Sequence, residues 1–236
     1  MKKIAGLLIF ILSGTLVQTL HAQTMDEIIN KHIEAMGGRE KIITLSTAVM
    51  TGTFTTAGAP AIHIVASKKH LVGSRIDIDA NGINNYQLIT TTNGWIFTPV
   101  QGDKEPRQLA EDQFRSGQAQ LDLHGPFVNY KEKGYQIVLA GKDTVKGSLC
   151  NKLKVTAPNG NVTVYSIDSR SNFIVKSTTR LFQFGSLEDV VTTYSDYKKN
   201  DDGFWFAYSN TSPRGETRYE TIETSKPVDV NIFKIK

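Results

Sequence analysis

Residues 70–99, which read HLVGSRIDIDANGINNYQLITTTNGWIFTP, are the most informative part of the chain. Three runs rich in β-branched and aromatic residues lie within this stretch, at 70–79, 84–92 and 94–99. The turn sequences Ala80-Asn81-Gly82 and Asn93-Gly94 separate them. Asn-Gly pairs favour tight hairpin turns, because both residues tolerate a positive φ angle. The stretch therefore predicts three consecutive antiparallel strands joined by hairpins.

The same pattern continues on both sides of this stretch. Turn sequences recur at Pro158-Asn159-Gly160-Asn161 and at Asn200-Asp201-Asp202-Gly203. Short strands at regular spacing with tight turns indicate one antiparallel sheet in up-and-down order. The further strands that we predict are 46–56, 61–67, 134–141, 148–157, 161–168, 173–182, 188–198, 203–211 and 215–225.

Two segments are expected to be helical instead. Thr24 and Glu27 have the spacing of a capping box, and an apolar face follows until Gly37-Gly38, which predicts a helix there. A second short helical turn is expected at 39–45. Residues 100–133 interrupt the strands as an insertion, with a predicted helix over 107–117 and a second amphipathic stretch around Gly125-Pro126.

A helix, a long antiparallel sheet and a helical insertion can bury their apolar faces in one arrangement. We expect an α+β, mostly β fold: an incomplete antiparallel β-barrel, or curled sheet, covered on its concave face by helices. A deep curl leaves an apolar cavity between the layers. We find no linker, so residues 23–236 are predicted to form a single domain.

Residues 1–22 are predicted to be a cleavable secretory signal peptide. Lys2 and Lys3 precede an almost wholly apolar run at 4–20, and Ala22 is a small residue at the expected cleavage point. The run is short for a membrane span, which needs about 20 apolar residues. No cysteine lies near residue 22, so we expect a released protein, not a lipid-anchored or membrane-spanning one.

Charge and composition exclude several classes of protein. The formal net charge is +4, and Lys2 and Lys3 account for two of these charges, so the remaining chain carries +2. Such a small excess provides no basic patch for nucleic acid. The single cysteine, Cys150, excludes an intrachain disulfide.

No catalytic or metal-binding motif is present in the sequence. The histidines lack the spacing of a metal site, and no nucleophile elbow, Walker loop or dinucleotide-binding motif occurs. Asp77 and Asp79 share a strand face, where they form either an acid pair or an ordinary solvated surface. We favour the solvated surface, and predict no enzyme activity, no metal and no cofactor.

Several segments resemble the periplasmic lipoprotein-carrier superfamily, which is LolA/LolB-like, and within it the outer-membrane lipoprotein-sorting branch. The resemblance covers most of the chain after residue 25 and rests on 26–38, 93–99, 134–147, 165–168 and Phe233. It implies an incomplete barrel with helices as a lid over an apolar cavity. It also implies a carrier of acyl chains in the periplasm.

The resemblance suggests one residue of the lid. Carriers of this family have an Arg on the second strand that hydrogen-bonds to the closed lid, and its position falls near Lys68. Lys68 is therefore expected to contact the lid, although lysine lacks the planar, multi-donor guanidinium. This departure leads us to expect a carrier-like protein for an apolar ligand and to stop short of lipoprotein delivery.

Large side chains in the predicted strands are candidates for the cavity wall, the alternative being ordinary core. We expect a soluble, monomeric periplasmic protein that binds a lipid or the acyl chain of a lipoprotein. The alternative is a periplasmic binding or sensor module that contacts envelope proteins or lipids through loops of the same fold. The candidate ligand-binding residues are Met50, Phe54, Trp95, Phe97, Tyr165 and Trp205.

Overall fold

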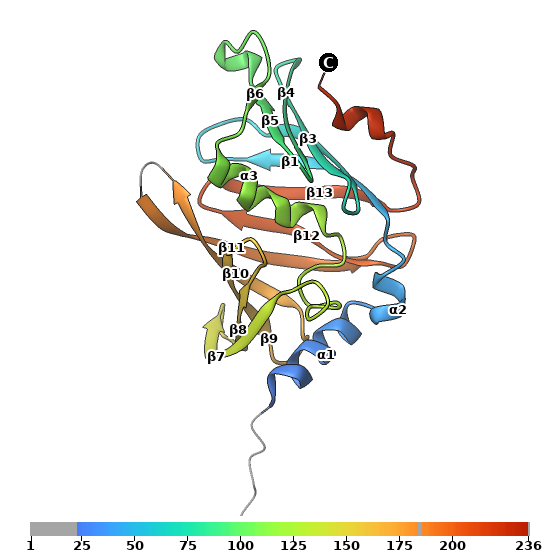
Figure 1. Ribbon diagram of the computed structural model, residues 1–236, viewed down its shortest axis with the longest axis vertical. Helices are drawn as coiled ribbons and strands as arrows, with labels where there is room; N and C mark the ends of the chain where they lie inside the picture. Colours follow the sequence, from blue (N-terminus) through green and yellow to red (C-terminus); the bar gives the residue numbers. More distant parts are fainter. Residues whose placement is uncertain (1–22, 184–185, 236) are drawn as a thin grey trace, which may run out of the picture.

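The computed structural model describes residues 23–183 and 186–235, most of which lie in one antiparallel sheet (Figure 1). Within these residues the sheet has thirteen strands, in the order β6-β5-β4-β3-β2-β1-β13-β12-β11-β10-β9-β8-β7. Strands adjacent in the sheet are also adjacent in the sequence, except for the pair β1 and β13. The prediction of a mostly β fold in up-and-down order is confirmed.

The strand bounds agree closely with the predicted ones. The strands are Thr47–Thr55 (β1), Ile62–Lys69 (β2), Gly73–Ala80 (β3), Ile83–Thr90 (β4), Gly94–Phe97 (β5), Arg107–Gln108 (β6), Gln136–Val145 (β7), Ser148–Thr156 (β8), Val162–Asp168 (β9), Ile174–Gln183 (β10), Ser186–Lys199 (β11), Trp205–Ser212 (β12) and Gly215–Glu223 (β13). The helical elements are Met25–Ala35 (α1), Arg39–Ile42 (α2), Glu111–Gly117 (α3) and the 3-10 turns Pro99–Gln101 (η1), Gln118–Leu121 (η2) and Val230–Phe233 (η3).

Helix α1 begins at the predicted capping box. The Glu27 N–H donates to Thr24 Oγ1 at 3.2 Å, and the Thr24 N–H donates to the Glu27 carboxylate at 2.9 Å. Ile28 and Ile29 on its apolar face are buried against a cluster from β7, β8 and β9 that includes Leu153. The helix therefore covers one end of the sheet.

The β3–β4 hairpin turns at Asn81 and Gly82, within the predicted turn sequence 80–82. Asn81 and Gly82 have φ angles of 57° and 79°, and Asp79 Oδ1 accepts the Gly82 N–H at 2.7 Å. Ala80 pairs with Ile83, so the strands continue directly from the turn. This is the geometry that an Asn-Gly pair favours, because neither residue pays the usual steric cost of positive φ.

The sheet is open between its edge strands, β6 and β7. Residues 109–135, which we call the β6–β7 connection, join these two strands and carry α3 and η2. In Figure 1 the connection crosses in front of the sheet, with α3 over β12 and β13. The predicted curled, incomplete barrel with helices over its concave face is confirmed, and the segment that covers the concave face also spans its open side.

The outer face of the sheet has a core of its own. Val49 and Leu88 pack there against Val228 and Phe233 from the C-terminal segment. Gly73 allows this contact, since a Cβ atom at this position would lie 2.5 Å from the Phe233 ring. Residues on both faces of β1 to β5 are thus covered by other parts of the chain.

One predicted helix begins later than expected. The helix predicted over 107–117 starts at Glu111, because Arg107 and Gln108 pair with Ile96 and Trp95 as strand β6. A strand of two residues is too short to produce an alternating pattern, so the sequence carried no signal for it.

The predicted signal peptide, residues 1–22, lies outside the described residues. Among the residues that are described, no helix has the length and apolar character needed to cross a membrane.

Candidate ligand-binding site

An apolar cavity of about 340 Å³ lies between the inner face of the sheet, α1, α2 and the β6–β7 connection. Its volume is at the lower end of the range for small-molecule sites, roughly 300–1,000 Å³. Each of these elements contributes apolar side chains to the wall, among them Ile33, Met36, Met50, Leu123, Phe204 and Phe206.

Two further cavities continue from this one beneath the β6–β7 connection. A cavity of about 490 Å³ shares Gly125, Pro126 and Tyr194 with the first. A third, of about 730 Å³, shares Ser116 and Leu181 with the second and lies between α3 and β3 to β5. The three cavities succeed one another along the concave face, an arrangement suited to a long and narrow ligand.

Lys68, on β2, lines the apolar cavity. Its Cα partners on the neighbouring strands are Ala48 and Ser74, which have short side chains. Within residues 23–183 and 186–235, its ammonium group has no hydrogen bond or ion pair. Burial lowers the pKa of the Lys68 ammonium, and no carboxylate opposes that effect.

Three of the other polar side chains in the walls of these cavities are bonded within the protein. Tyr197 donates its hydroxyl to the Ile174 carbonyl at 2.7 Å, and His32 Nδ1 donates to the Asn172 carbonyl at 2.8 Å. The Tyr194 hydroxyl lies 3.0 Å from Ser177 Oγ, in the second cavity. These groups are satisfied without a ligand, in contrast to the ammonium of Lys68.

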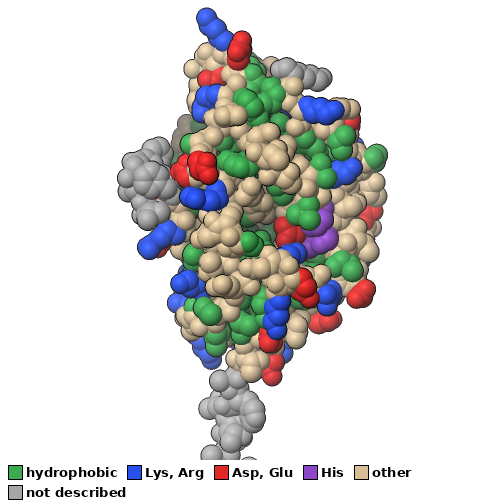
Figure 2. All heavy atoms as spheres, viewed as in Figure 1, with side chains coloured by type: hydrophobic (Ala, Val, Ile, Leu, Met, Phe, Trp, Pro, Cys, Tyr) green, Lys and Arg blue, Asp and Glu red, His purple; other side chains and the backbone are tan. Residues whose placement is uncertain are grey.

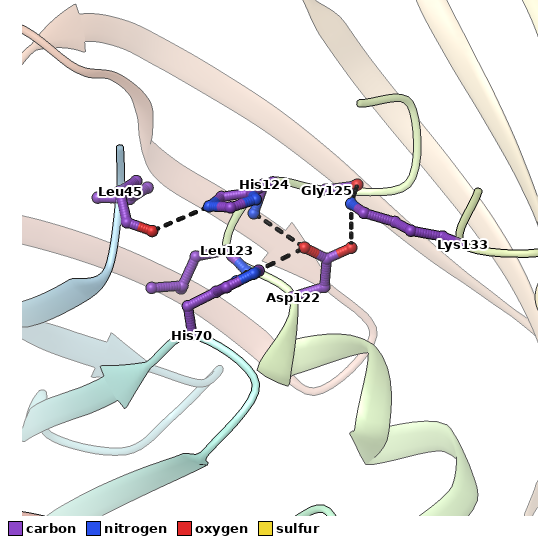
Figure 3. Close-up of polar contacts among 7 residues, drawn as sticks. All are labelled: Leu45, His70, Asp122, Leu123, His124, Gly125 and Lys133. Atoms are coloured by element: carbon purple, nitrogen blue, oxygen red, sulfur yellow. Dashed lines mark hydrogen bonds and ion pairs between the residues drawn. The ribbon is translucent and has the colours of Figure 1, made fainter. Parts of the chain in front are cut away.

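A cluster of polar residues fastens the β6–β7 connection beside this cavity (Figure 3). We call His70, Asp122, His124 and Lys133 the histidine–aspartate latch. Lys133 Nζ lies 2.6 Å from Asp122 Oδ2, and Asp122 Oδ1 accepts the His124 N–H at 3.0 Å. His70 follows β2, whereas the other three residues belong to the connection, so the latch ties the connection to the sheet.

Hydrogen bonds define the role of one ring nitrogen in each imidazole of the latch. His70 Nδ1 accepts the Leu123 N–H at 3.1 Å, so this nitrogen carries no proton. His124 Nε2 lies 3.1 Å from the Leu45 carbonyl, to which it must donate. Burial lowers the pKa of His70, as do the charges of His124 and Lys133, while Asp122 raises it. The neutral form of His70 therefore suits the folded state.

The latch also brings together potential metal ligands. One ligand atom each from His70, Asp122 and His124 lies within 4.8 Å of the others. However, His70 Nδ1 already accepts a backbone N–H, and Lys133 supplies the positive charge beside Asp122. This donor set fits a hydrogen-bonded fastening better than a metal centre.

Four of the predicted site residues lie along the cavities. Met50, Lys68 and Trp205 line the same apolar cavity, and Tyr165 lines the adjoining one. Lys68, predicted to contact a lid, shares its cavity with residues of the β6–β7 connection but makes no hydrogen bond to it among the described residues.

The structure places the other three predicted residues away from the described cavities. Trp95 packs against the outer-face cluster around Leu88, and the Phe97 ring lies 5.6 Å from that of Tyr86. Both point away from the concave face because side chains alternate along a strand and Ile96, between them, lines the inner cavity. Phe54, near the end of β1, lies over Gly215.

Sequence reasoning did not select the wall residues that come from outside the sheet. Ile33 belongs to α1, Met36 is the C-cap residue of that helix, and Leu123 belongs to the amphipathic stretch of the insertion. Both patterns were visible in the sequence. That these residues line the same cavity as Met50 could not be predicted, because it depends on where the β6–β7 connection crosses the sheet.

The acidic pair considered in the sequence lies on the outer face. Asp77 accepts hydrogen bonds from Arg75 at 2.8 Å and from Asn84 at 3.0 Å, and Asp79 closes the β3–β4 turn. Both carboxylates therefore form hydrogen bonds to neighbouring residues on the surface of the strands.

The exposed face that carries the connection has a mixed surface. In Figure 2, basic and acidic side chains are interspersed with hydrophobic ones over this face. Such a distribution differs from the single-sign stripe that nucleic acid requires.

Comparisons with known proteins identify the fold. No protein-family model and no curated protein matches the sequence. A LolA superfamily protein from Nitrosomonas europaea is 15% identical, with a TM-score of 0.58, over 90% of this chain and 98% of that one.

Two further solved structures are similar. A putative outer-membrane lipoprotein-sorting protein domain from Vibrio parahaemolyticus is 14% identical, with a TM-score of 0.54 and coverage of 88% and 94%. A DUF1329 family protein from Desulfovibrio piger is 13% identical, with a TM-score of 0.58 and coverage of 90% and 98%. At these identities the matches concern architecture alone. The chain therefore has a LolA/LolB-like fold.

Proposed function

We propose that this protein is a carrier that binds an acyl chain or another apolar ligand in the cavities under the β6–β7 connection. The observation that carries the proposal is the succession of three cavities along the concave face, the first of them with a predominantly apolar wall. Such a hollow is unusual for a domain whose interior serves only stability, because protein interiors are normally close-packed.

The energetics of such a site favour a ligand with a long apolar chain. Each Å² of apolar surface removed from water stabilises the complex by about 25 cal/mol. A chain that occupied the apolar cavity would be enclosed by Met50, Trp205 and Leu123, which belong to the sheet and to the connection. The connection has to move for such a ligand to enter, and the latch is where it is fastened.

On the basis of the predicted signal peptide, we assign the protein to the periplasm, and we propose that it acts there as a soluble monomer. We assign it no catalytic activity. One similar structure is named as a lipoprotein-sorting domain, so the acyl chains of lipoproteins are one ligand class to test, and free lipids are another.

The experiment is to purify the protein from its native envelope and to analyse an organic extract of it by mass spectrometry. The expected result is a co-purifying lipid in stoichiometric amount. Delipidated protein should then bind a fluorescent fatty-acid probe. A protein that is empty and ignores the probe would contradict a carrier, and a crosslinked protein partner without bound lipid would support a binding or sensor module in its place.

A further inference from the structure

We infer that the ligand is an amphiphile with an anionic head group, and that Lys68 binds this head group at the wall of the apolar cavity. This inference rests on the proposed function and adds the chemical class of its ligand. A fatty acid is the simplest molecule of that class.

The ammonium group of Lys68 is isolated among the described residues. Lys68 lines a cavity whose wall also contains Met50, Phe206 and Leu123. No described residue accepts a hydrogen bond from it or pairs with it. A charged group in apolar surroundings is costly unless it is paired, so the ammonium charge of Lys68 is unfavourable in the protein without a ligand.

Asp122, the acidic residue of the latch, is already engaged. Asp122 is paired with Lys133 at 2.6 Å and accepts the His124 N–H at 3.0 Å. His124 lines the cavity together with Lys68, yet its Nε2 donates to the Leu45 carbonyl. The polar groups of the latch are therefore paired with one another or with the backbone. A partner for the Lys68 ammonium would have to come from outside the chain.

The wall of the apolar cavity carries few charged side chains. Among the described residues that line the apolar cavity, Lys68 is the one lysine or arginine and there is no carboxylate, whereas most of the other side chains are apolar. A mainly apolar wall with a single ammonium group and no carboxylate matches a molecule with one anionic head and an apolar tail. Charge-assisted hydrogen bonds from Nζ would orient that molecule in the cavity.

The test compares ligands that differ only in the head group. Hexadecanoic acid, hexadecan-1-ol and acetate are titrated calorimetrically into delipidated protein at pH 8, where the carboxylates are ionised. Wild-type protein is expected to bind hexadecanoate about tenfold more tightly than hexadecanol, the effect of one charged hydrogen bond. Acetate should show no measurable binding, because it lacks the tail.

Variants at two neighbouring lysines make the test specific. Lys68→Met should abolish the preference for hexadecanoate and leave hexadecanol binding within twofold. Lys69→Met, at the next position of β2 and hence on the opposite face, should retain the preference. Lys68→Arg should retain most of it, since the charge remains. Thermal melting of each variant establishes that it is folded.

The outcomes separate this inference from the proposed function. Equal binding of hexadecanoate and hexadecanol by wild type and Lys68→Met would overturn the role of Lys68 and leave the carrier intact. Acetate binding as tight as hexadecanoate binding would also overturn it, because the site would then take the anion alone. Failure of both long-chain ligands to bind would contradict the proposed function itself.

Discussion

The imidazole rings of His70 and His124 stack with their centroids 3.7 Å apart and their planes inclined by 21°. One ring follows β2 and the other belongs to the β6–β7 connection, so the stack joins the sheet to the segment that covers it. Two positive charges at this distance would repel each other. The attachment of the connection is therefore expected to depend on pH.

We predict that mild acid weakens this attachment. The pKa of His70 is lowered in the folded protein, so below the ordinary value of 6.5 the unfolded state binds more protons than the folded state. The free energy of unfolding should be highest above pH 6.5 and should fall as the pH drops toward the lowered pKa. Urea denaturation between pH 8 and pH 5 measures this slope.

The variant His70→Asn isolates the contribution of His70. Its side-chain oxygen can still accept the Leu123 N–H, but it does not titrate, so the slope should become shallower. Burial also lowers the pKa of His32, whose contribution persists in the variant. His63→Asn, at an exposed position on β2, should keep the wild-type slope. Identical slopes for all three proteins would refute the assignment to His70.

We predict that Lys133→Met loosens the β6–β7 connection. The variant removes the 2.6 Å ion pair with the largely buried Asp122 and a 2.9 Å hydrogen bond to the Gly125 carbonyl. The expected loss is about 1–3 kcal/mol of stability, with faster hydrogen exchange in residues 118–133. Lys104→Met, on the exposed surface, is the control. Unchanged exchange in 118–133 would show that the ion pair does not hold the connection.

We predict that alanine substitutions of the two tryptophans affect different properties, ligand affinity in one case and stability in the other. Trp205 lines the apolar cavity, so Trp205→Ala should weaken binding of hexadecanoic acid about tenfold or more. Trp95 packs on the outer face, so Trp95→Ala should cost about 2–4 kcal/mol of stability and leave affinity within twofold. Calorimetric titration and urea denaturation of both variants check the pair. Equal losses of affinity would argue against the cavity as the binding site.

We predict that Gly52→Ala is severely destabilising. A Cβ atom at this position would lie 2.0 Å from the Arg218 carbonyl oxygen and 2.7 Å from the Tyr219 Cα atom, at an irregularity in the β1–β13 register. These are backbone atoms, so relief requires the strands to separate, at a cost of about 3 kcal/mol. Urea denaturation measures it, with Thr51→Ala as the neighbouring control. A change below about 0.5 kcal/mol would mean that the strands adjust freely.

Local sequence patterns were sufficient to predict most elements of the fold. The Asn81-Gly82 turn and the Thr24–Glu27 capping box each depend on neighbouring residues only, and both have the expected geometry. The pairing of β1 with β13 had no local signal, because it joins distant segments. Strand β6 had none either, since two residues cannot display a period.

The candidate site was less predictable, for a physical reason. Trp95 and Trp205 look alike in the sequence, as aromatic residues in strands, but they lie on opposite faces. Which face is concave depends on the curl of the whole sheet. The latch was not predicted, because His70 and Asp122 become neighbours only when the connection folds across the concave face.

The pairing of β1 with β13 has a consequence for how the protein folds. Every other strand pair in the described residues forms between neighbours in the chain, and such hairpins close quickly. The Met50–Ile222 pair instead closes a loop that contains almost the whole sheet, which is entropically costly. During synthesis β1 appears first and waits for β13, which appears last. Until then β1 has an unpaired edge open to aggregation, so assembly of the sheet is completed only by its final strand.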